Sequence, residues 1–315
     1  VMVKRKISIV IPCYNSEHTI LKVLHELEEV LKEEVYEVVL VNDSSKDDTW
    51  NVIKTLASQQ NNIVAVDFAR NFGQHAALMA GFARVSGDIV VTMDDDGQAP
   101  IDSLLDLVDS INDETDVVFG EYIHKIQKRI YRRLGSWLDT KMCEILLNKQ
   151  KNLYLSTFMA AKRYVIDECL KYDGSYPYIA GLVLRTTDKI VNIPVEQRNR
   201  IEGDTGYSFR KLVALWMNGF TTFSVKPLRI ASVVGFATAI IGFIYGIILI
   251  IRKIVNPDIV VGYSSIVCSI LFVGGIVMIM LGMVGEYLGR VYMSMNKAPQ
   301  YTVRSIVDHR SLEEK

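Results

Sequence analysis

Cysteine is scarce in this chain, and the spacing of the few cysteines excludes two kinds of protein. The 315 residues include only four cysteines, Cys13, Cys143, Cys169 and Cys268, and no two of them form a Cys-x-x-Cys pair. Disulfide frameworks and structural zinc sites both need clustered cysteines. The sequence therefore predicts free thiols in reducing surroundings, and neither a zinc site nor a disulfide-stapled fold.

The chain also lacks a strong net charge, the common nucleotide-binding glycine motifs and a secretory signal, and each absence excludes a class of protein. The formal net charge is only −1, so no overall positive field attracts nucleic acid, and we expect no nucleic-acid partner. No Gly-x-Gly-x-x-Gly follows the first apolar run and no Walker motif occurs, which argues against a dinucleotide or a triphosphate cradle. The basic residues 1–6 run straight into an apolar segment, so no cleaved secretory peptide is expected.

Short apolar runs alternate with helical patterns over the first two thirds of the chain. The runs are residues 7–11 (ended by Pro12), 38–41, 63–68, 88–93 and 116–119, and residues 16–32 have helical spacing. Continuous Val/Ile runs separated by helices predict a Rossmann-like α/β fold with a mostly parallel sheet covered on both faces. In such sheets ligands bind at the carboxyl ends of the strands.

Two long stretches without any charge lie in the last third of the chain, at residues 230–251 and 263–285. A helix needs about 20 apolar residues to cross the hydrocarbon core of a membrane. A buried core helix is the alternative, but two such stretches joined by a short Asn256-Pro257 turn favour a transmembrane hairpin. Basic residues beside both outer ends, including Lys226, Arg229 and Arg290, favour cytosolic flanks.

Domain boundaries follow from these patterns. Apolar residues recur at helical spacing around Trp216, which predicts an amphipathic helix either at the membrane interface or over the domain core. The predicted parts are a cytoplasmic catalytic domain (1–207), an amphipathic juxtamembrane region (208–229), two transmembrane helices (230–251 and 263–285) and a cytoplasmic C-terminal tail (286–315).

The strongest local motif is Asp94-Asp95-Asp96-Gly97-Gln98, directly after an apolar run. Three adjacent carboxylates repel one another unless a cation joins them, and a hard divalent cation prefers oxygen ligands. In extended backbone Asp94 and Asp96 point the same way and Asp95 points to the other side. A solvated acidic turn is the alternative. Polar segments 12–17 and 42–48 end two other strands, so together they predict a nucleotide-sized crevice.

Several motifs together resemble one enzyme family. They are residues 11–15 (Ile-Pro-Cys-Tyr-Asn), 41–45 (Val-Asn-Asp-Ser-Ser), 70–75, Asp94-x-Asp96-x-Gln98, 200–209, 226–229 and 285–290. Over essentially its whole length the chain resembles the polyprenyl-phosphate glycosyltransferases of family 2. The resemblance implies a GT-A catalytic domain followed by a two-helix transmembrane hairpin. It also implies inverting, metal-dependent transfer of a sugar from a nucleotide, preferably UDP, to a polyprenyl phosphate, preferably undecaprenyl phosphate.

The resemblance also implies roles for individual residues. Donor binding is expected of Pro12, Tyr14, Asn15, Glu17, Asp43, Asp94 and Asp95. Asp94 and Asp96 are the expected ligands of Mg²⁺ or Mn²⁺, and the catalytic set is Asp96, Gln98 and Arg200. The acceptor phosphate is expected to meet Arg200, Thr205 and Tyr207. The implied partners are a nucleotide sugar, a polyprenyl phosphate, the bacterial inner membrane and further copies of the chain, as a tetramer.

One departure from the family concerns the catalytic base. Relatives often carry an acidic residue on a strand that here reads residues 155–159, where this chain has Ser156 and Thr157. A phosphate monoester has a second pKa of about 6, so it is already largely a dianion near pH 7. We therefore expect positioning and metal electrostatics to dominate, and we expect His75 to pack or cap rather than to act as a base.

Other functions fit parts of this pattern less well. A processive polysaccharide synthase normally has more spans and a Gln-x-x-Arg-Trp motif, and this chain has neither. A non-enzymatic, nucleotide-regulated transport subunit would be expected to carry charges inside its spans, since intramembrane charges are costly and usually functional. Both predicted spans lack them.

Overall fold

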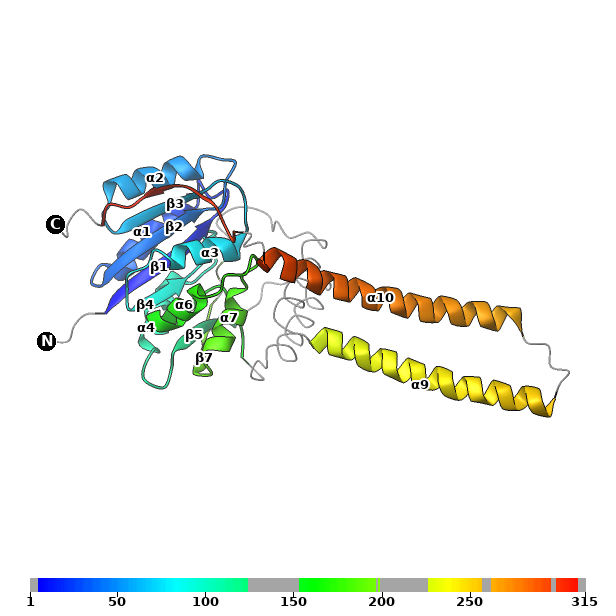
Figure 1. The fold of residues 1–315 in the computed structure, drawn as a ribbon. Helices are drawn as coiled ribbons and strands as arrows, with labels where there is room; N and C mark the ends of the chain where they lie inside the picture. Colours follow the sequence, from blue (N-terminus) through cyan, green and yellow to red (C-terminus); the bar gives the residue numbers. More distant parts are fainter. Residues whose placement is uncertain are drawn as a thin grey trace. The chain divides into compact units, whose positions relative to one another are not determined.

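The computed structural model describes residues 5–123, 153–196, 198, 226–256, 262–295 and 299–310. The chain divides into two compact units (Figure 1). One unit is made of Val1–Val213 together with Lys297–Lys315, and the other of Ala214–Asn296. The first unit therefore takes segments from both sides of the second.

The described part of the first unit holds one eight-stranded sheet in the order β7-β5-β6-β4-β1-β2-β3-β8. The strands are β1 (Lys6–Cys13), β2 (Val35–Asn42), β3 (Ile63–Phe68), β4 (Ile89–Thr92), β5 (Val117–Tyr122), β6 (Met159–Lys162), β7 (Ile190–Val195) and β8 (Val303–Val307). β6 and β8 run antiparallel to their neighbours, and the remaining pairs are parallel. The predicted α/β fold with a mostly parallel sheet is confirmed.

Two of the differences between the observed and the predicted strands concern residues beside the site. β1 continues through Pro12 to Cys13, still paired with β2, although its pairing with β4 stops at Val10. Proline has no backbone N–H, but beyond Val10 no bond to β4 requires one, so Pro12 does not interrupt the sheet. The strand predicted over residues 155–159 is wrong, since β6 begins only at Met159 and residues 153–158 form the connection before it. That connection brings Thr157 beside the end of β4, where its carbonyl accepts a hydrogen bond from the Thr92 hydroxyl (2.6 Å).

Helices cover both faces of the sheet. They are α1 (Ile20–Leu31), α2 (Thr49–Gln59), α3 (Gln74–Phe82), η1 (Ile101–Ser103), α4 (Leu104–Asp109), α6 (Arg163–Leu170) and α7 (Ile179–Thr186). Helix α1 buries Val23 and Leu27 with Ile9 of β1 in one core, to which α2 and α4 also contribute. Helix α3 lies on the other face, where a Cβ at Gly81 would come within 2.3 Å of the Val10 side chain.

The second unit contains two long helices, α9 (Lys226–Val255) and α10 (Tyr263–Met295). Within the described residues, one segment is long and apolar enough to cross a membrane, Phe272–Gly289 in α10, and none of it is buried. Helix α9 contains a shorter apolar stretch, Val233–Ile248. Phe236 and Met278 are 71% and 70% exposed, whereas a core helix of a water-soluble domain would bury such side chains.

The C-terminal part of the chain was only partly anticipated. The sequence analysis assigned residues 286–315 to a tail, but residues 303–307 form β8 at the edge of the catalytic sheet, beside β3. Helix α10 also runs beyond residue 285, to Met295. Most of the predicted amphipathic region, residues 208–225, lies outside the described residues.

Candidate active site

The carboxyl ends of β1, β2 and β4 meet at one edge of the sheet, because these three strands are adjacent and parallel. Hydrogen bonds join the loops that follow them. The N–H of Tyr14 donates to Asp95 Oδ2 (2.9 Å), and the N–H of Asn15 donates to Ser45 Oγ (3.0 Å). The N–H of Lys46 donates in turn to Asn15 Oδ1 (2.9 Å). The three predicted polar segments therefore form one connected surface.

The acidic motif follows the end of β4 in a turn, and its carboxylates are held by neutral donors. Asp94 Oδ1 accepts from Gln74 Nε2 (2.6 Å), and Asp94 Oδ2 accepts from the Thr157 hydroxyl (2.8 Å). Asp96 Oδ1 accepts from the backbone N–H of Gln98 (3.0 Å). Neither Gln74 nor Thr157 adds a charge, so they orient Asp94 and leave it able to meet a cation.

The charge of this motif affects the pKa of Tyr122, the last residue of β5. Burial raises the pKa of its phenol, and the carboxylates of Asp94 and Asp96 raise it further. Both carboxylates therefore act electrostatically on one side chain. Asp95 instead faces the loop after β1, and burial raises its pKa above the usual range, with Asp96 adding to the effect. The sequence analysis missed Tyr122, although its place at a strand end was a usable signal.

Asp94 and Asp96 fit a divalent ion that is shared with a substrate. The described residues contain no group of three His, Cys, Asp or Glu side chains placed to hold a metal ion. Mg²⁺ is commonly bound by one or two carboxylates together with substrate phosphates, not by an all-protein cage. Two oriented carboxylates in an acidic turn match that donor set.

Asp43 organises the loop after β3. It is 4% exposed, and its two carboxylate oxygens accept from the N–H groups of Phe72 (2.7 Å) and Gly73 (2.8 Å). Burial raises the pKa of Asp43, and these two hydrogen bonds oppose the rise. Gly73 has φ +92°, a conformation that favours glycine, and it leads directly into α3 and Gln74. Asp43 thus fixes the loop from which Gln74 reaches Asp94.

The remaining predicted donor residues lie along the same edge. Pro12 is buried in β1, and Tyr14 is 46% exposed beyond the strand. Glu17 Oε2 accepts from the N–H of Asp48 (2.7 Å), which ties the loop after β1 to the start of α2. Asn15 has a left-handed backbone (φ 54°), as does Ser44 (φ 56°). These loops are sharply turned rather than extended.

The predicted acceptor residues Arg200, Thr205 and Tyr207 lie outside the described residues. Arg198, after β7, does approach the acidic motif. Its N–H donates to the Gln98 carbonyl (3.2 Å), and its guanidinium pairs with Glu26 (2.5 Å) and with Asp102. The carboxyl end of β7 therefore reaches the same turn, which a sequence pattern could not indicate.

His75 is placed for packing. Its ring lies edge-on to Tyr178 with centroids 5.3 Å apart, and burial lowers its pKa to about 4, so the imidazole is neutral near pH 7. Its Nδ1 atom is buried and has no hydrogen-bond partner among the described residues. Within that part of the chain, nothing orients His75 as a base.

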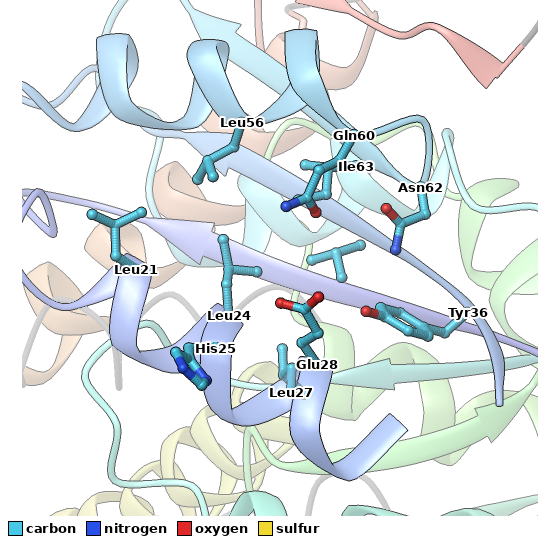
Figure 2. A pocket seen from close by; sticks show the side chains of 11 residues that line it. Leu21, Leu24, His25, Leu27, Glu28, Tyr36, Leu56, Gln60, Asn62 and Ile63 are labelled. Atoms are coloured by element: carbon cyan, nitrogen blue, oxygen red, sulfur yellow. The ribbon is translucent and has the colours of Figure 1, made fainter. Parts of the chain in front are cut away.

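A pocket on the described surface lies away from this site (Figure 2). Leu24 of α1 and Leu56 of α2 line it together with Tyr36 and Ile63. Tyr36 and Ile63 lie at the amino ends of β2 and β3, whereas the acidic motif follows the carboxyl end of β4. The pocket is therefore at the opposite ends of the strands from the acidic motif. It contributes nothing to the site described above.

Comparison with known proteins identifies two parts of the chain. Residues 8–170 match the family model "Glycosyl transferase family 2", and residues 226–291 match the model "GtrB C-terminal hairpin". The matched regions correspond to most of the sheet and to the two long helices. The resemblance noted from the motifs is confirmed.

Similar proteins match over nearly their full length. A prophage bactoprenol glucosyl transferase homolog of Escherichia coli K12 is 33% identical over 96% of this chain and 99% of that protein. An undecaprenyl-phosphate 4-deoxy-4-formamido-L-arabinose transferase of Klebsiella pneumoniae strain 342 is 30% identical over 96% and 94%. A solved glucosyl-3-phosphoglycerate synthase from Mycobacterium tuberculosis is 23% identical over 64% and 73%, with a TM-score of 0.49, which is too distant to transfer ligands.

Sheet order, acidic motif and helical hairpin thus agree with the family match. The match of residues 8–170 spans more than half of the chain. The chain belongs to glycosyl transferase family 2 and is a glycosyltransferase.

Proposed function

We propose that this glycosyltransferase moves a sugar from a nucleotide donor, UDP-linked by preference, to a polyprenyl phosphate, with undecaprenyl phosphate as the expected carrier. The observation that carries the proposal is an acidic motif beside the carboxyl ends of the parallel strands, in a chain that also has an apolar helical hairpin. Relatives of similar length are named for bactoprenol or undecaprenyl phosphate, which supports a lipid carrier. Their sugars differ, so the sugar transferred here is left open.

Seven residues make up the proposed donor site: Pro12, Tyr14, Asn15, Glu17, Asp43, Asp94 and Asp95. Their loops are joined by the hydrogen bonds between Tyr14 and Asp95 and between Asn15 and Ser45. Such cross-links hold the loops in one arrangement before the nucleotide arrives, which lowers the ordering cost of binding.

Asp94 and Asp96 would hold Mg²⁺ or Mn²⁺. When bound, such an ion offsets the negative charge that develops on the departing nucleoside diphosphate, without any proton transfer. The Thr157 hydroxyl and the Gln74 amide orient Asp94, and the Gln98 N–H orients Asp96. Gln98 is proposed to lie beside the reacting centre.

The acceptor phosphate is proposed to meet Arg200, with Thr205 and Tyr207 beside it. An arginine fork donates two parallel hydrogen bonds to phosphate oxygens and so can orient them. The phosphate is largely a dianion near pH 7 and needs no base to become nucleophilic. Attack from the face opposite the leaving nucleotide inverts the configuration at the sugar carbon.

The fold supports one topology for the membrane. A single sheet contains strands from before α9 and a strand from after α10, so both ends of the hairpin lie on the same side of any membrane that the two helices cross. Nucleotide sugars are made in the cytosol, and we propose that this side is the cytoplasmic face of the bacterial inner membrane. The resemblance also implies a homo-oligomer, with a tetramer as the expected size.

The test is transfer of labelled sugar from UDP-, dTDP- and GDP-sugars to undecaprenyl phosphate by the full chain in detergent. Label should enter the lipid fraction with Mg²⁺ or Mn²⁺ and not with EDTA. Asp96→Asn should abolish transfer, whereas Glu114→Gln, an exposed carboxyl outside the site, should leave it unchanged. If no donor yields a lipid product although a nucleotide sugar binds, the acceptor assignment is wrong. A polymeric product would favour the polysaccharide-synthase alternative.

A further inference from the structure

The segment after the membrane hairpin forms part of the catalytic sheet. This segment, residues 299–310, is called the C-terminal strap. Its β8 pairs with β3, the Tyr301 ring stacks on Phe68 with centroids 5.2 Å apart and planes at 10°, and the N–H of Ala69 donates to the Thr302 carbonyl (2.9 Å). Without the strap, β3 would present an unpaired edge. The strap therefore holds the strand from which the loop at residues 69–73 emerges.

Arg304 of the strap supplies the countercharge of a buried carboxylate. The Asp67 side chain is 2% exposed, and its Oδ2 atom is buried without a hydrogen-bond partner among the described residues. Arg304 Nη1 lies 3.4 Å from that oxygen, and Arg304 Nη2 donates to the Ala69 carbonyl (3.1 Å). A buried charge is costly unless it is paired, so removing Arg304 would leave Asp67 free to reorient or to admit water.

Asp67 in turn orients the residues that enter the proposed donor site. Asn42 is 2% exposed, and its Nδ2 donates to Asp67 Oδ1 (2.8 Å). Asn42 Oδ1 accepts from both the N–H (3.1 Å) and the hydroxyl (2.6 Å) of Ser45. Ser45 Oγ then accepts from the N–H of Asn15 (3.0 Å). An unbroken path of contacts thus runs from Arg304 to Asn15.

A second path runs through aromatic rings. Phe68, on which Tyr301 stacks, meets Phe72 edge-on with centroids 5.6 Å apart. The N–H of Phe72 donates to Asp43 (2.7 Å). Two independent routes from the strap therefore end at proposed donor-binding residues, one at Asn15 and the other at Asp43.

We propose that the C-terminal strap positions the donor pocket, with Arg304 as its main positioning residue. The inference rests on the proposed function, because it takes Asn15 and Asp43 to contact the nucleotide. On this proposal, residues that follow the membrane hairpin contribute to the affinity for the nucleotide donor. Arg304 is a positioning residue in this proposal, and it acts through its contacts with Asp67 and with the Ala69 carbonyl.

The strap offers a matched control. Arg310 also pairs with a buried carboxylate, Glu37, at 2.8 Å, and Lys6 pairs with the same carboxylate at 2.9 Å. Glu37 lies near the amino end of β2, whereas the donor loops follow the carboxyl ends of the strands. Arg304→Met and Arg310→Met therefore remove the same group from the same segment, and both should lower thermal stability. Only the first should disturb the donor pocket.

The experiment measures UDP affinity by calorimetry, and the donor KM and kcat of transfer, for the full chain in detergent. Arg304→Met should weaken UDP binding and raise the donor KM by about tenfold while kcat changes little. Arg304→Lys should recover most of the affinity, and Arg310→Met should bind UDP as the parent chain does. Equal UDP affinity in Arg304→Met and the parent chain would overturn the inference, as would equal weakening in both methionine variants.

A double variant guards against misfolding and tests the route. Asp67→Asn removes the buried charge but keeps an acceptor for Asn42, so adding Arg304→Met should cost far less affinity in this background than in the parent chain. If the cost is the same in both backgrounds, Arg304 does not act through Asp67, and the inference is wrong. A parent chain that binds none of UDP, GDP and dTDP would instead contradict the proposed function itself.

Discussion

Thr157 lies in the connection before β6, and its hydroxyl donates to Asp94 Oδ2 at 2.8 Å. A neutral donor at this place fixes the direction of the Asp94 carboxylate without adding a charge. The neighbouring Ser156 hydroxyl donates to the Phe158 carbonyl (2.8 Å) and does not touch the acidic motif. Adjacent hydroxyls in one connection therefore have different surroundings.

This difference gives a residue-scale prediction. Thr157→Val keeps the side-chain shape but removes the hydrogen bond to a charged group, which is worth about 1.5–3 kcal/mol, so kcat should fall by roughly 10- to 100-fold. The metal concentration for half-maximal activity should rise as well. Metal titrations of transfer activity measure both, with Ser156→Ala as the control. Unchanged metal dependence in Thr157→Val would show that the hydroxyl does not position Asp94.

The buried carboxylate of Glu37 predicts how the stability of the folded chain depends on pH. Burial alone would raise the pKa of Glu37, but hydrogen bonds from Lys6, Ser8 and Ser86 outweigh burial and lower it from 4.5 to about 2. A lowered carboxyl pKa stabilises the folded state above the unfolded value, and this stabilisation of about 3 kcal/mol is lost as pH falls from about 4.5 to 2.

Unfolding of the detergent-solubilised chain between pH 7 and pH 2.5 measures this effect. Glu37→Gln should be less stable than the parent chain at pH 7 and should lose less of its stability on acidification. The pKa of Asp116 is also lowered to about 2, because hydrogen bonds, first that from Lys162, outweigh burial. Both proteins should therefore keep the part of the pH dependence of stability that Asp116 causes. Parallel pH curves for the two proteins would contradict the assignment.

At the scale of elements, the contact between α3 and β1 leaves no room for a side chain at Gly81. A methyl group at Gly81 would stand 2.3 Å from Val10 Cγ1, and Val10 is fully buried in a central strand. We expect Gly81→Ala to lower the free energy of unfolding by about 1–3 kcal/mol, the usual cost of overpacking. Chemical denaturation measures it. Adding Val10→Ala should relieve the clash, so a double variant as unstable as the sum of the single ones would contradict this packing.

Elements also differ in how well the sequence predicted them. The strands at residues 38–41, 63–68 and 116–119 were expected within one to three residues of their observed ends, because buried parallel strands are continuous apolar runs. β8 was not predicted. It is a short edge strand in which half-buried and exposed side chains alternate, so it has no continuous apolar run. Residues 155–159 were expected to form a strand from the resemblance to relatives, but residues 155–157 are half-buried in the connection before β6, and only Met159 belongs to that strand.

At the scale of the whole molecule, the fold makes a prediction about topology. With the four native cysteines replaced by alanine, Asn256→Cys between the two long helices should react with a membrane-impermeant maleimide in intact bacteria. Glu114→Cys, in the catalytic unit, should react only after the membrane is permeabilised. Equal labelling of both sites in intact cells would contradict a hairpin with a cytoplasmic catalytic unit.

The sequence by itself determined the features that depend on local order. The mostly parallel sheet follows from apolar runs, the hairpin from two uncharged stretches, and the acidic motif from carboxylates adjacent in the chain. Each run, stretch or motif is continuous in the chain, so it can be recognised before anything is known of the fold. The family assignment depended on the same local motifs.

Only the tertiary structure decided which residues support that motif and its surroundings. Thr157 meets Asp94 across 63 positions, and Arg304 meets Ala69 across 235. The charges of Asp94 and Asp96 reach Tyr122 because β4 and β5 end on the same side of the sheet, and Arg304 faces Asp67 because β8 pairs with the side of β3 that β2 leaves open. Such contacts follow from strand order, and residues so far apart in the chain leave no local pattern from which strand order could be inferred.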